Sequence, residues 1–207
     1  PEPLLKTPAG QYGPSADETP GGPYKVNPNN TFDYTVTSFA SASGLFTDPS
    51  EGQKKAGEWK MADGTHVEMV PDGQLAGVIG GKYYLALDIF LFGTVDGAKQ
   101  AFDYIQKQTA AVKDTEPQQF KGLGNQAVGY RLKSGTVGTS DVGQVYHRFI
   151  LRRGTLVAVV QTTGAETHMT IDQAREIAVI IDDKALGKRK TVLPTPVPTP
   201  IVPPVTN

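Results

Sequence analysis

The chain lacks cysteine altogether: none of its 207 residues is a Cys. This absence excludes a disulfide scaffold, catalysis by a thiolate and zinc sites built on thiolates. It is compatible with a protein that faces an oxidising space without using disulfides. The sequence also has no run of about 20 apolar residues, the length that a membrane-spanning helix needs. We therefore expect no transmembrane segment in this chain.

An excess of charge of one sign is missing as well. The 20 Lys and Arg residues and the 21 Asp and Glu residues are interspersed, and the formal net charge is -1. A nucleic-acid-binding protein needs a strongly basic face. Only residues 184–190, KALGKRK, are locally basic, and this is ordinary for a helix C-terminus followed by a linker. We expect no nucleic-acid partner.

Proline is concentrated at the two ends of the chain. Residues 1–30 are crowded with Pro, Gly and Asn, and residues 188–207 hold a basic trio followed by a Pro/Thr/Val tract. These compositions predict an extended or disordered leader at 1–30 and a polyproline-type tail or linker at 188–207. Residues 31–187 then form a single domain of ordinary length. A flexible leader before a compact domain is typical of a mature lipoprotein or a tethered exported domain.

The middle of the chain is rich in β-structure signals. Residues 31–40 contain an alternating β-branched and aromatic run, and residues 57–70 and 75–93 each predict two short strands, around Asp63-Gly64 and Gly80-Gly81. The second arm of the latter, Tyr83 to Phe92, is apolar enough for a central strand buried on both sides. Three more strands are predicted after the middle of the chain, over 126–132, 145–153 and 155–162.

Two segments have helical periodicity instead. The first helix is expected to start at Thr94 or Asp96 and to run to about Val112, with its apolar residues at steps of three and four. In the second, Thr170 and Gln173 form a capping box, and Gly187 is the stop signal. The order of elements predicts an α+β fold in which an antiparallel sheet carries both amphipathic helices on one face.

The most familiar motif in the sequence is Gly122-x-Gly124-x-x-Ala127, which fits the dinucleotide-binding fingerprint GxGxxG/A. That fingerprint requires a buried strand before the glycines and a helix after them. Here the order is inverted, because a helix precedes the motif and a strand follows it. We therefore interpret the glycines as a tight entry into the sheet, with Leu123 inserted into the core, and expect no cofactor.

The histidines and carboxylates do not form a recognisable reaction centre. His66, His147 and His168 share no metal-ligand spacing, so we expect no metal site. His147 alternates with apolar residues and is interpreted as a core histidine. Asp88 interrupts the apolar run LALDIFLF. If it is buried it needs a partner such as Arg131, Arg148 or Arg152, but we favour a half-exposed strand face.

No catalytic residue is therefore assigned, and we expect the protein not to be an enzyme. The candidate surface for a ligand or partner consists of residues that combine charge, hydrogen-bonding capacity or an aromatic ring on predicted strands: Asp88, Arg131, His147, Arg148 and Tyr84. A hydrolase or isomerase using Asp88 and His147 stays as an alternative, and it requires both side chains to share a cleft.

Four stretches follow one another in the second half of the chain: DGAKQAFDYI, GLGNQAVGY, RFILRRGTLVAVV and AREIAVIIDDKAL. Over about residues 82–187 they resemble small bacterial envelope lipoproteins and the extracellular sensor domains of some receptor Ser/Thr kinases, and they are similar to the PsbP/Mog-type α/β sandwich. Asn125-Gln126 stands where an acidic pair is usual in that pattern. The resemblance implies an exported, non-enzymatic binding or accessory domain, and it supplies no catalytic residue.

Two functions follow from these expectations. The first is a non-catalytic extracytoplasmic binding or sensor-type domain of a membrane-tethered protein, with a small ligand or a protein as its partner. The second is an accessory subunit that docks on a larger membrane-associated complex through its extended tails. Whether the tails are structurally ordered discriminates between these two functions, because a tail that holds one conformation must be buried against some surface.

Overall fold

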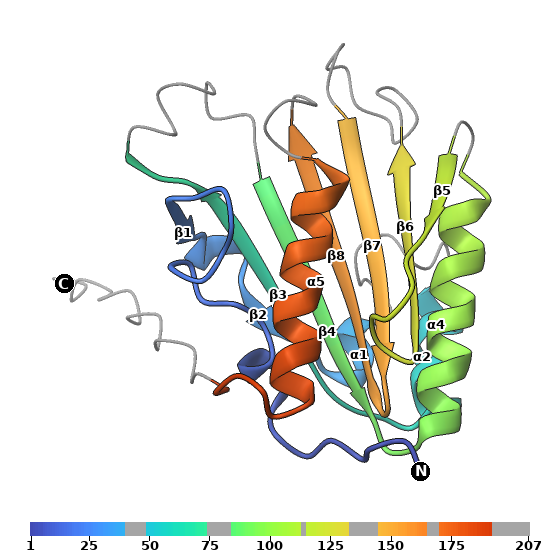
Figure 1. Ribbon diagram of the computed structural model, residues 1–207. Helices are drawn as coiled ribbons and strands as arrows, with labels where there is room; N and C mark the ends of the chain where they lie inside the picture. Colours follow the sequence, from blue (N-terminus) through green and yellow to red (C-terminus); the bar gives the residue numbers. More distant parts are fainter. Residues whose placement is uncertain (40–48, 74–83, 113–114, 133–144, 165–169, 192–207) are drawn as a thin grey trace, which may run out of the picture.

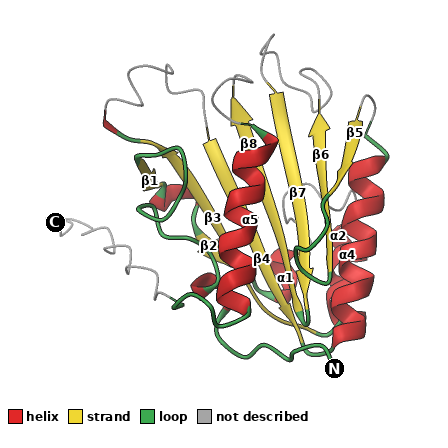
Figure 2. Cartoon of the chain, viewed as in Figure 1, coloured by secondary structure: helices red, strands yellow, loops and turns green. Residues whose placement is uncertain are grey.

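The computed structural model describes residues 1–39, 49–73, 84–112, 115–132, 145–164 and 170–191. Within these ranges the protein is an α+β fold, as expected from the sequence, built on one antiparallel sheet (Figures 1 and 2). The strands are β1 Tyr24–Val26, β2 Phe32–Asp33, β3 Met61–Pro71, β4 Tyr84–Phe92, β5 Thr115–Gln119, β6 Gln126–Leu132, β7 Val145–Arg153 and β8 Leu156–Gly164. Their order is β1-β3-β4-β8-β7-β6-β5, and β2 also pairs with β3.

The helices of the described residues are α1 Val36–Phe39, α2 Pro49–Glu58, α4 Val95–Ala110 and α5 Ile171–Ala185, with short 3₁₀ turns η1 Ala9–Gln11 and η2 Pro28–Asn30. Both long helices begin where the sequence predicts. The Thr94 side chain accepts a hydrogen bond from the amide of Gly97, and that of Thr170 accepts one from the amide of Gln173. The second half of the expected capping box is absent, because the Gln173 side-chain amide turns away from Thr170 toward residues of the expected leader.

The two long helices lie on opposite faces of the sheet, which corrects the expectation that both lie on one face. On one face α5 packs against β6, β7 and β8, over core residues that include Phe149 and Val160. On the other face α4, α1 and α2 cover the alternate residues, including Phe90 and Val157. The central strands are apolar on both sides, so each face needs its own cover. The faces are called here the α5 face and the α4 face.

Residues 57–70 do not form a hairpin. They pass from the end of α2 into the single long strand β3, and Asp63-Gly64 lies inside that strand next to an irregularity in its pairing with β4. The Asp63 carboxylate accepts hydrogen bonds from the backbone amides of Ala9 and Gly64. A dipeptide that favours turns is used here to anchor another segment instead. The expected turn at Gly80-Gly81 lies outside the described residues.

The alternating run at 31–40 gives only two residues of strand, β2, and then turns into the short helix α1. Helix α2 and strand β5 have no counterpart among the expected elements. Pro117 lies within β5, at the edge of the sheet. An edge strand tolerates proline because one side of its backbone needs no partner.

Residues 1–30 differ most from their expected role. They are not a leader outside the domain: they supply β1, which pairs with β3, and they bury Ala9, Tyr12 and Tyr24 in the core cluster on the α5 face. We call residues 1–23 the strap. The tail at 188–207 is described only as far as residue 191.

Polar side chains of α5 hold the strap in place. The Lys184 ammonium donates to the carbonyl of Gly13 and to the Glu18 carboxylate, both at 2.7 Å. The Gln173 amide donates to the carbonyl of Pro20 at 2.7 Å and to the hydroxyl of Tyr24 at 3.1 Å. Burial raises the pKa of the Tyr24 hydroxyl, although the bond from Gln173 opposes this. The strap therefore buries against its own domain.

The glycine motif at 122–127 leads into β6, and Leu123 is buried in the core of the α5 face as expected. Both glycines have positive φ, +79° at Gly122 and +63° at Gly124. A Cβ on Gly122 would meet nothing within 4 Å, whereas one on Gly124 would lie 2.4 Å from Leu151 Cδ1 and 2.6 Å from the Arg152 carbonyl oxygen. The motif is a structural turn in which only the second glycine is also tightly enclosed.

This difference gives a matched pair of substitutions. We expect Gly122→Ala to lower the free energy of unfolding by about 1 kcal/mol, the cost of a left-handed alanine. Gly124→Ala adds a clash with backbone and is expected to cost at least about 3 kcal/mol. Urea denaturation followed by the fluorescence of Trp59 measures both. Equal losses would contradict the proposed enclosure of Gly124.

Candidate functional site

The five residues of the expected binding surface do not come together. Asp88 and Arg148 lie on the α4 face, whereas Arg131 and His147 are neighbours in register on the α5 face. The backbone of Tyr84 pairs with Thr163, and its side chain is outside the described part of the chain. Because Asp88 and His147 point to opposite faces, they cannot act as an acid–base pair, and the hydrolase or isomerase alternative is wrong.

Asp88 is fully buried, which corrects the interpretation of a half-exposed strand face. Its Oδ1 accepts a hydrogen bond from the Tyr34 hydroxyl at 2.6 Å and lies 2.7 Å from His66 Nδ1. Tyr34 reaches this position because it follows β2 directly, and His66 stands opposite Asp88 in the pairing of β3 with β4. These two partners are a tyrosine and a histidine, whereas the sequence suggested an arginine.

The contact with Asp88 fixes the orientation of the His66 ring. A carboxylate against Nδ1 favours the tautomer with the proton on that nitrogen, which leaves Nε2 as an acceptor in the neutral ring. The ring of Phe32 stacks on His66, with the centroids 5.0 Å apart. Among the described residues, no side chain that could act as a nucleophile hydrogen-bonds to Nε2. The cluster of Tyr34, His66 and Asp88 therefore orients a histidine and ties β2 to the sheet.

The other candidate residues also have protein partners. Arg148 donates to the Gln161 side chain and to the Thr109 hydroxyl of α4. Arg131 lies 3.5 Å from the Glu116 carboxylate. These contacts link neighbouring strands or join the sheet to α4, which is a structural use of the groups.

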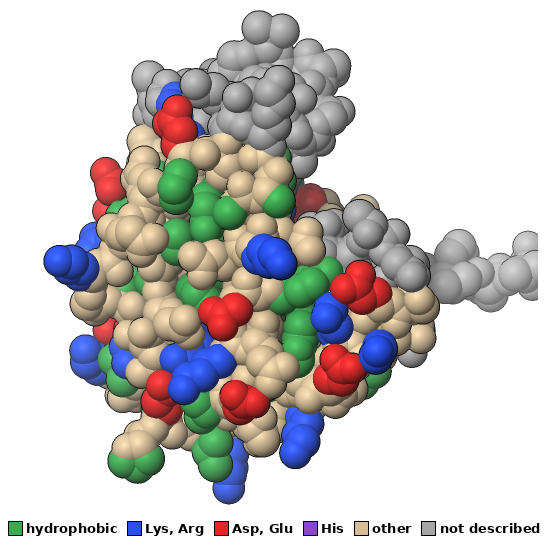
Figure 3. Space-filling model, turned by 90° about the vertical axis from the view of Figure 1, so that its right-hand side faces the viewer, with side chains coloured by type: hydrophobic (Ala, Val, Ile, Leu, Met, Phe, Trp, Pro, Cys, Tyr) green, Lys and Arg blue, Asp and Glu red, His purple; other side chains and the backbone are tan. Residues whose placement is uncertain are grey.

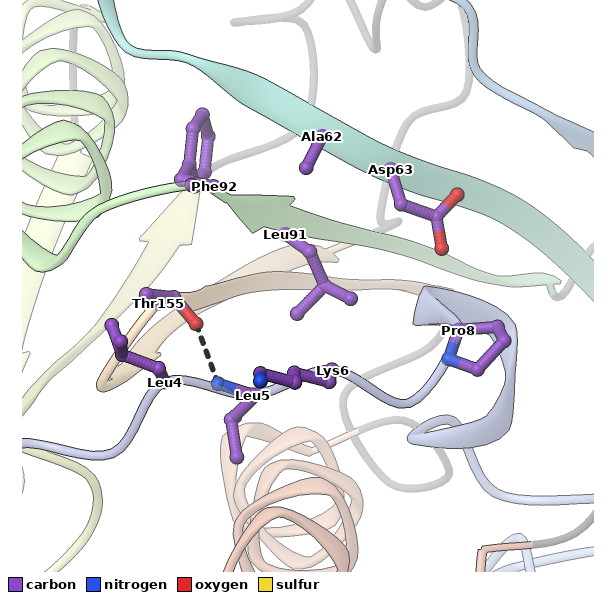
Figure 4. A pocket seen from close by; sticks show the side chains of 10 residues that line it. Leu4, Leu5, Lys6, Pro8, Ala62, Asp63, Leu91, Phe92 and Thr155 are labelled. Carbon is purple, nitrogen blue, oxygen red and sulfur yellow. Dashed lines mark hydrogen bonds between the residues drawn. The ribbon is translucent and has the colours of Figure 1, made fainter.

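A cleft lies instead between the strap and the ends of β3 and β4 (Figure 4). Its volume is about 420 Å³, within the range of small-molecule sites. The lining is mainly apolar and comes from two walls. The strap contributes Leu4, Leu5, Lys6 and Pro8, and the sheet contributes Ala62, Asp63, Leu91, Phe92, Gly93 and Thr155.

Two hydrogen bonds, one at each side of the cleft, hold the strap against the sheet. The amide of Leu5 donates to the Thr155 hydroxyl at 2.9 Å, and the amide of Ala9 donates to the Asp63 carboxylate at 2.7 Å. Figure 4 shows the Leu5 side chain directed away from Leu91, toward α5, where it packs against the core. Leu4 is 63% exposed, so an apolar group at the mouth of the cleft is left to solvent.

An ion pair closes the N-terminal end of the strap. The Glu2 carboxylate binds the guanidinium of Arg152, a buried side chain that also contacts Gln126 and the carbonyl of Gly154. The hydrogen bond from Arg152 holds the pKa of Glu2 below its usual value, against the effect of burial. The next residue after Arg152 is Arg153, whose guanidinium donates to the Asp182 carboxylate of α5. This hydrogen bond raises the pKa of the guanidinium. The anchor at this end is therefore electrostatic.

Other classes of site find no support in the part of the chain that the structure describes. No group of three or more His, Asp or Glu residues there could hold a metal ion. No helix in the same residues is long and apolar enough to cross a membrane. The surface seen from the side of α4 and β5 carries basic and acidic side chains intermingled, without a patch of one sign (Figure 3).

Comparison with known proteins adds little to this description. No protein-family model matches the sequence, and no curated protein sequence matches it. Among solved structures, the extracellular domain of PknH from Mycobacterium tuberculosis is similar with a TM-score of 0.49 and 10% identity. The match covers 79% of this chain and 81% of that one. At this level the likeness concerns the course of the backbone and says nothing about a ligand.

The buried polar cluster gives a second stability prediction. Asp88→Ala takes this acceptor away from the Tyr34 hydroxyl and His66 Nδ1, so we expect a loss of about 3 kcal/mol in the free energy of unfolding. Asp33→Ala, on the exposed side of β2, is the matched control and should change it by less than about 0.5 kcal/mol. Chemical denaturation of both variants measures these changes. An Asp88→Ala variant with an unchanged free energy of unfolding would show that the cluster does not stabilise the fold.

Proposed function

We propose that the protein is a non-catalytic extracytoplasmic binding domain of a membrane-tethered protein, and that it binds a small ligand in the cleft beneath the strap. The observation that supports this most is the 420 Å³ volume between two separately anchored walls. Concave sites with a mainly apolar lining and a few polar groups are typical of small-molecule binding. The absence of cysteine is compatible with an extracytoplasmic location.

The lining favours a ligand with an apolar body and an anionic end. Leu4, Leu91 and Phe92 offer apolar surface, and the exposed Lys6 offers a cation at the mouth. The Asp63 carboxylate already accepts two backbone amides, so it is less available to a cationic ligand. A molecule of this kind gains from burying its apolar part while its charge stays near water.

The accessory-subunit alternative loses half of its basis. It rested on two extended tails that need surfaces on neighbouring proteins. The strap finds its surface on its own domain, through Lys184, Gln173 and Arg152. Of the two tails, the one at 188–207 is left as a candidate for such an arm.

Binding of 1-anilinonaphthalene-8-sulfonate tests the proposal, because this probe combines an apolar ring system with a sulfonate. We expect saturable binding to the folded protein at neutral pH. Ala62→Trp fills the cleft from an exposed position and should abolish binding, whereas Ala110→Trp, on an exposed position of α4, should leave it unchanged. Fluorescence titration measures probe binding by each variant, and unfolding curves of the same proteins check that each variant is folded.

The charge preference is tested separately with Lys6→Glu. We expect about threefold weaker binding of the same probe at low ionic strength, and a smaller effect at high salt, because Lys6 is exposed and its charge is screened. Binding that is unaffected by both Ala62→Trp and Lys6→Glu would contradict the assignment of the cleft as the site.

A further inference from the structure

The strap is fastened to α5 through a lysine that has no access to water. The side chain of Lys184 is 0% exposed, and its ammonium contacts the Gly13 carbonyl and the Glu18 carboxylate. A buried ammonium is costly unless a charge and hydrogen bonds compensate it. Both compensating groups belong to the strap. Lifting the strap separates this cation from its carboxylate, and the docked state therefore depends on the charge of Glu18.

Beneath the strap lies an apolar part of the sheet that α5 leaves uncovered. Ala9 and Tyr12 are buried there, and a Cβ on Gly13 would lie 3.3 Å from Ile89 and 3.9 Å from Leu87. The strap thus covers core residues of β4 and also forms one wall of the cleft. Release of the strap would therefore expose these core residues and remove one wall of the cleft.

We propose that the strap is an acid-released latch: it is closed while Glu18 is ionised, and protonation of Glu18 frees it from α5 and opens the cleft on that side. The latch itself follows from the strap contacts, and its role in ligand binding rests on the proposed function. A ligand that contacts both walls binds the closed form better, so by reciprocity it also stabilises the closed strap.

The surroundings of the latch set the direction of the pH effect. Around Glu18, Lys184 faces it from α5, and Ser15 of the strap donates to it through its amide at 2.9 Å. On α5, the neighbouring Asp182 and Asp183 are directed to Arg153, and to Lys188 and Arg189, respectively. At the other end of the strap, Glu2 faces Arg152, with Lys99 and Arg153 contributing longer-range attraction.

The sign follows from the pKa of Glu18. Burial alone would raise it, but the bonds from Lys184 and Ser15 outweigh this effect and the pKa is lowered from 4.5. A carboxyl group with a lowered pKa stabilises the closed state above its ordinary pKa. That contribution is lost as the pH falls through the lowered value. The pKa of Glu2 is lowered too, so acid weakens both ends of the strap in the same direction.

The absence of cysteine allows a direct measurement of strap opening. Ala9→Cys places a single thiol beneath the strap, and Ala158→Cys places one in the central strand β8; both positions are fully buried. The rate at which a thiol reagent labels each protein at neutral pH reports the population in which that residue is exposed. The thiol at position 158 reports global unfolding, and the thiol at position 9 also reports release of the strap.

Glu18→Gln imitates the protonated carboxyl at neutral pH. We expect it to speed labelling of the thiol at position 9 by at least about tenfold, since the charged partner of a buried ammonium is lost, with little change at position 158. Asp17→Asn, on the adjacent exposed residue, should change neither rate. Equal acceleration at both positions, or no acceleration at position 9, would overturn the latch.

Two further measurements guard against a misfolded protein. Lys184→Met removes the buried charge while it keeps the volume, so Glu18→Gln should add no further acceleration in that background. In the wild type, hydrogen exchange followed as the pH falls from neutral through the lowered pKa of Glu18 should show the strap losing protection relative to β8, and Glu18→Gln should show less of this change. An effect of Glu18→Gln that persists without Lys184 would contradict the proposal.

These measurements contain no ligand, so their failure is distinct from failure of the proposed function. A strap that stays closed in Glu18→Gln overturns the latch and leaves binding in the cleft intact. A working latch combined with absent probe binding overturns the site and leaves the strap mechanism standing. If both hold, Glu18→Gln should also weaken probe binding by about the factor by which it depletes the closed strap.

Discussion

The buried ammonium of Lys184 is the constraint on which the first part of the chain depends. It lies on the last turn of α5, out of contact with water, and both of its partners come from a segment more than 160 residues earlier in the sequence. A charge in such a place would be strongly unfavourable without them. Gln173, about three turns earlier on the same helix, binds the strap through its side-chain amide. Helix α5 thus packs on the sheet with its apolar stripe and holds the strap with its polar flank.

This arrangement solves a problem that the sheet creates. The central strands are apolar on both sides, and the α4 face is closed by three helices of the described residues. The α5 face has one long helix, which leaves the part of the sheet over β3 and β4 to be covered. Ala9, Tyr12 and Tyr24 supply this cover. The cleft arises at one end of the same interface, where the strap passes from Glu2 to Ala9 and hydrogen bonds hold it to the sheet at intervals.

The elements that the sequence predicts well are those whose signal is local. Strands β6, β7 and β8 and helices α4 and α5 have strong periodicity and clear starts, such as Thr94 and Thr170, and they lie where expected. Residues 1–30 could not be placed in the same way, because their Pro and Gly content is that of a loop while their fixed position comes from Lys184 and Gln173. The hairpin predicted at Asp63-Gly64 was wrong for a related reason. The turn preference of this dipeptide was outweighed by the pairing of β3 with β4 along most of its length.

The candidate site was harder still. The expected surface was assembled from residues on different strands without knowledge of which face each would occupy, so it divides between the two faces. The partners of Asp88 depend on the register of β3 against β4, which no local pattern specifies. The cleft combines residues 4–8 with residues 91–93 and Thr155, and the first of these groups had been placed outside the domain.

The most direct test of this account is native-state hydrogen exchange of the strap amides that donate to the sheet, Leu5 and Ala9, compared with amides of β4. The account predicts protection at neutral pH well above that of an unstructured peptide, because both amides are bonded to Thr155 and Asp63 in a strap that covers the core. Exchange at the unprotected rate, with β4 fully protected, would show that the strap does not dock and that the cleft has no second wall.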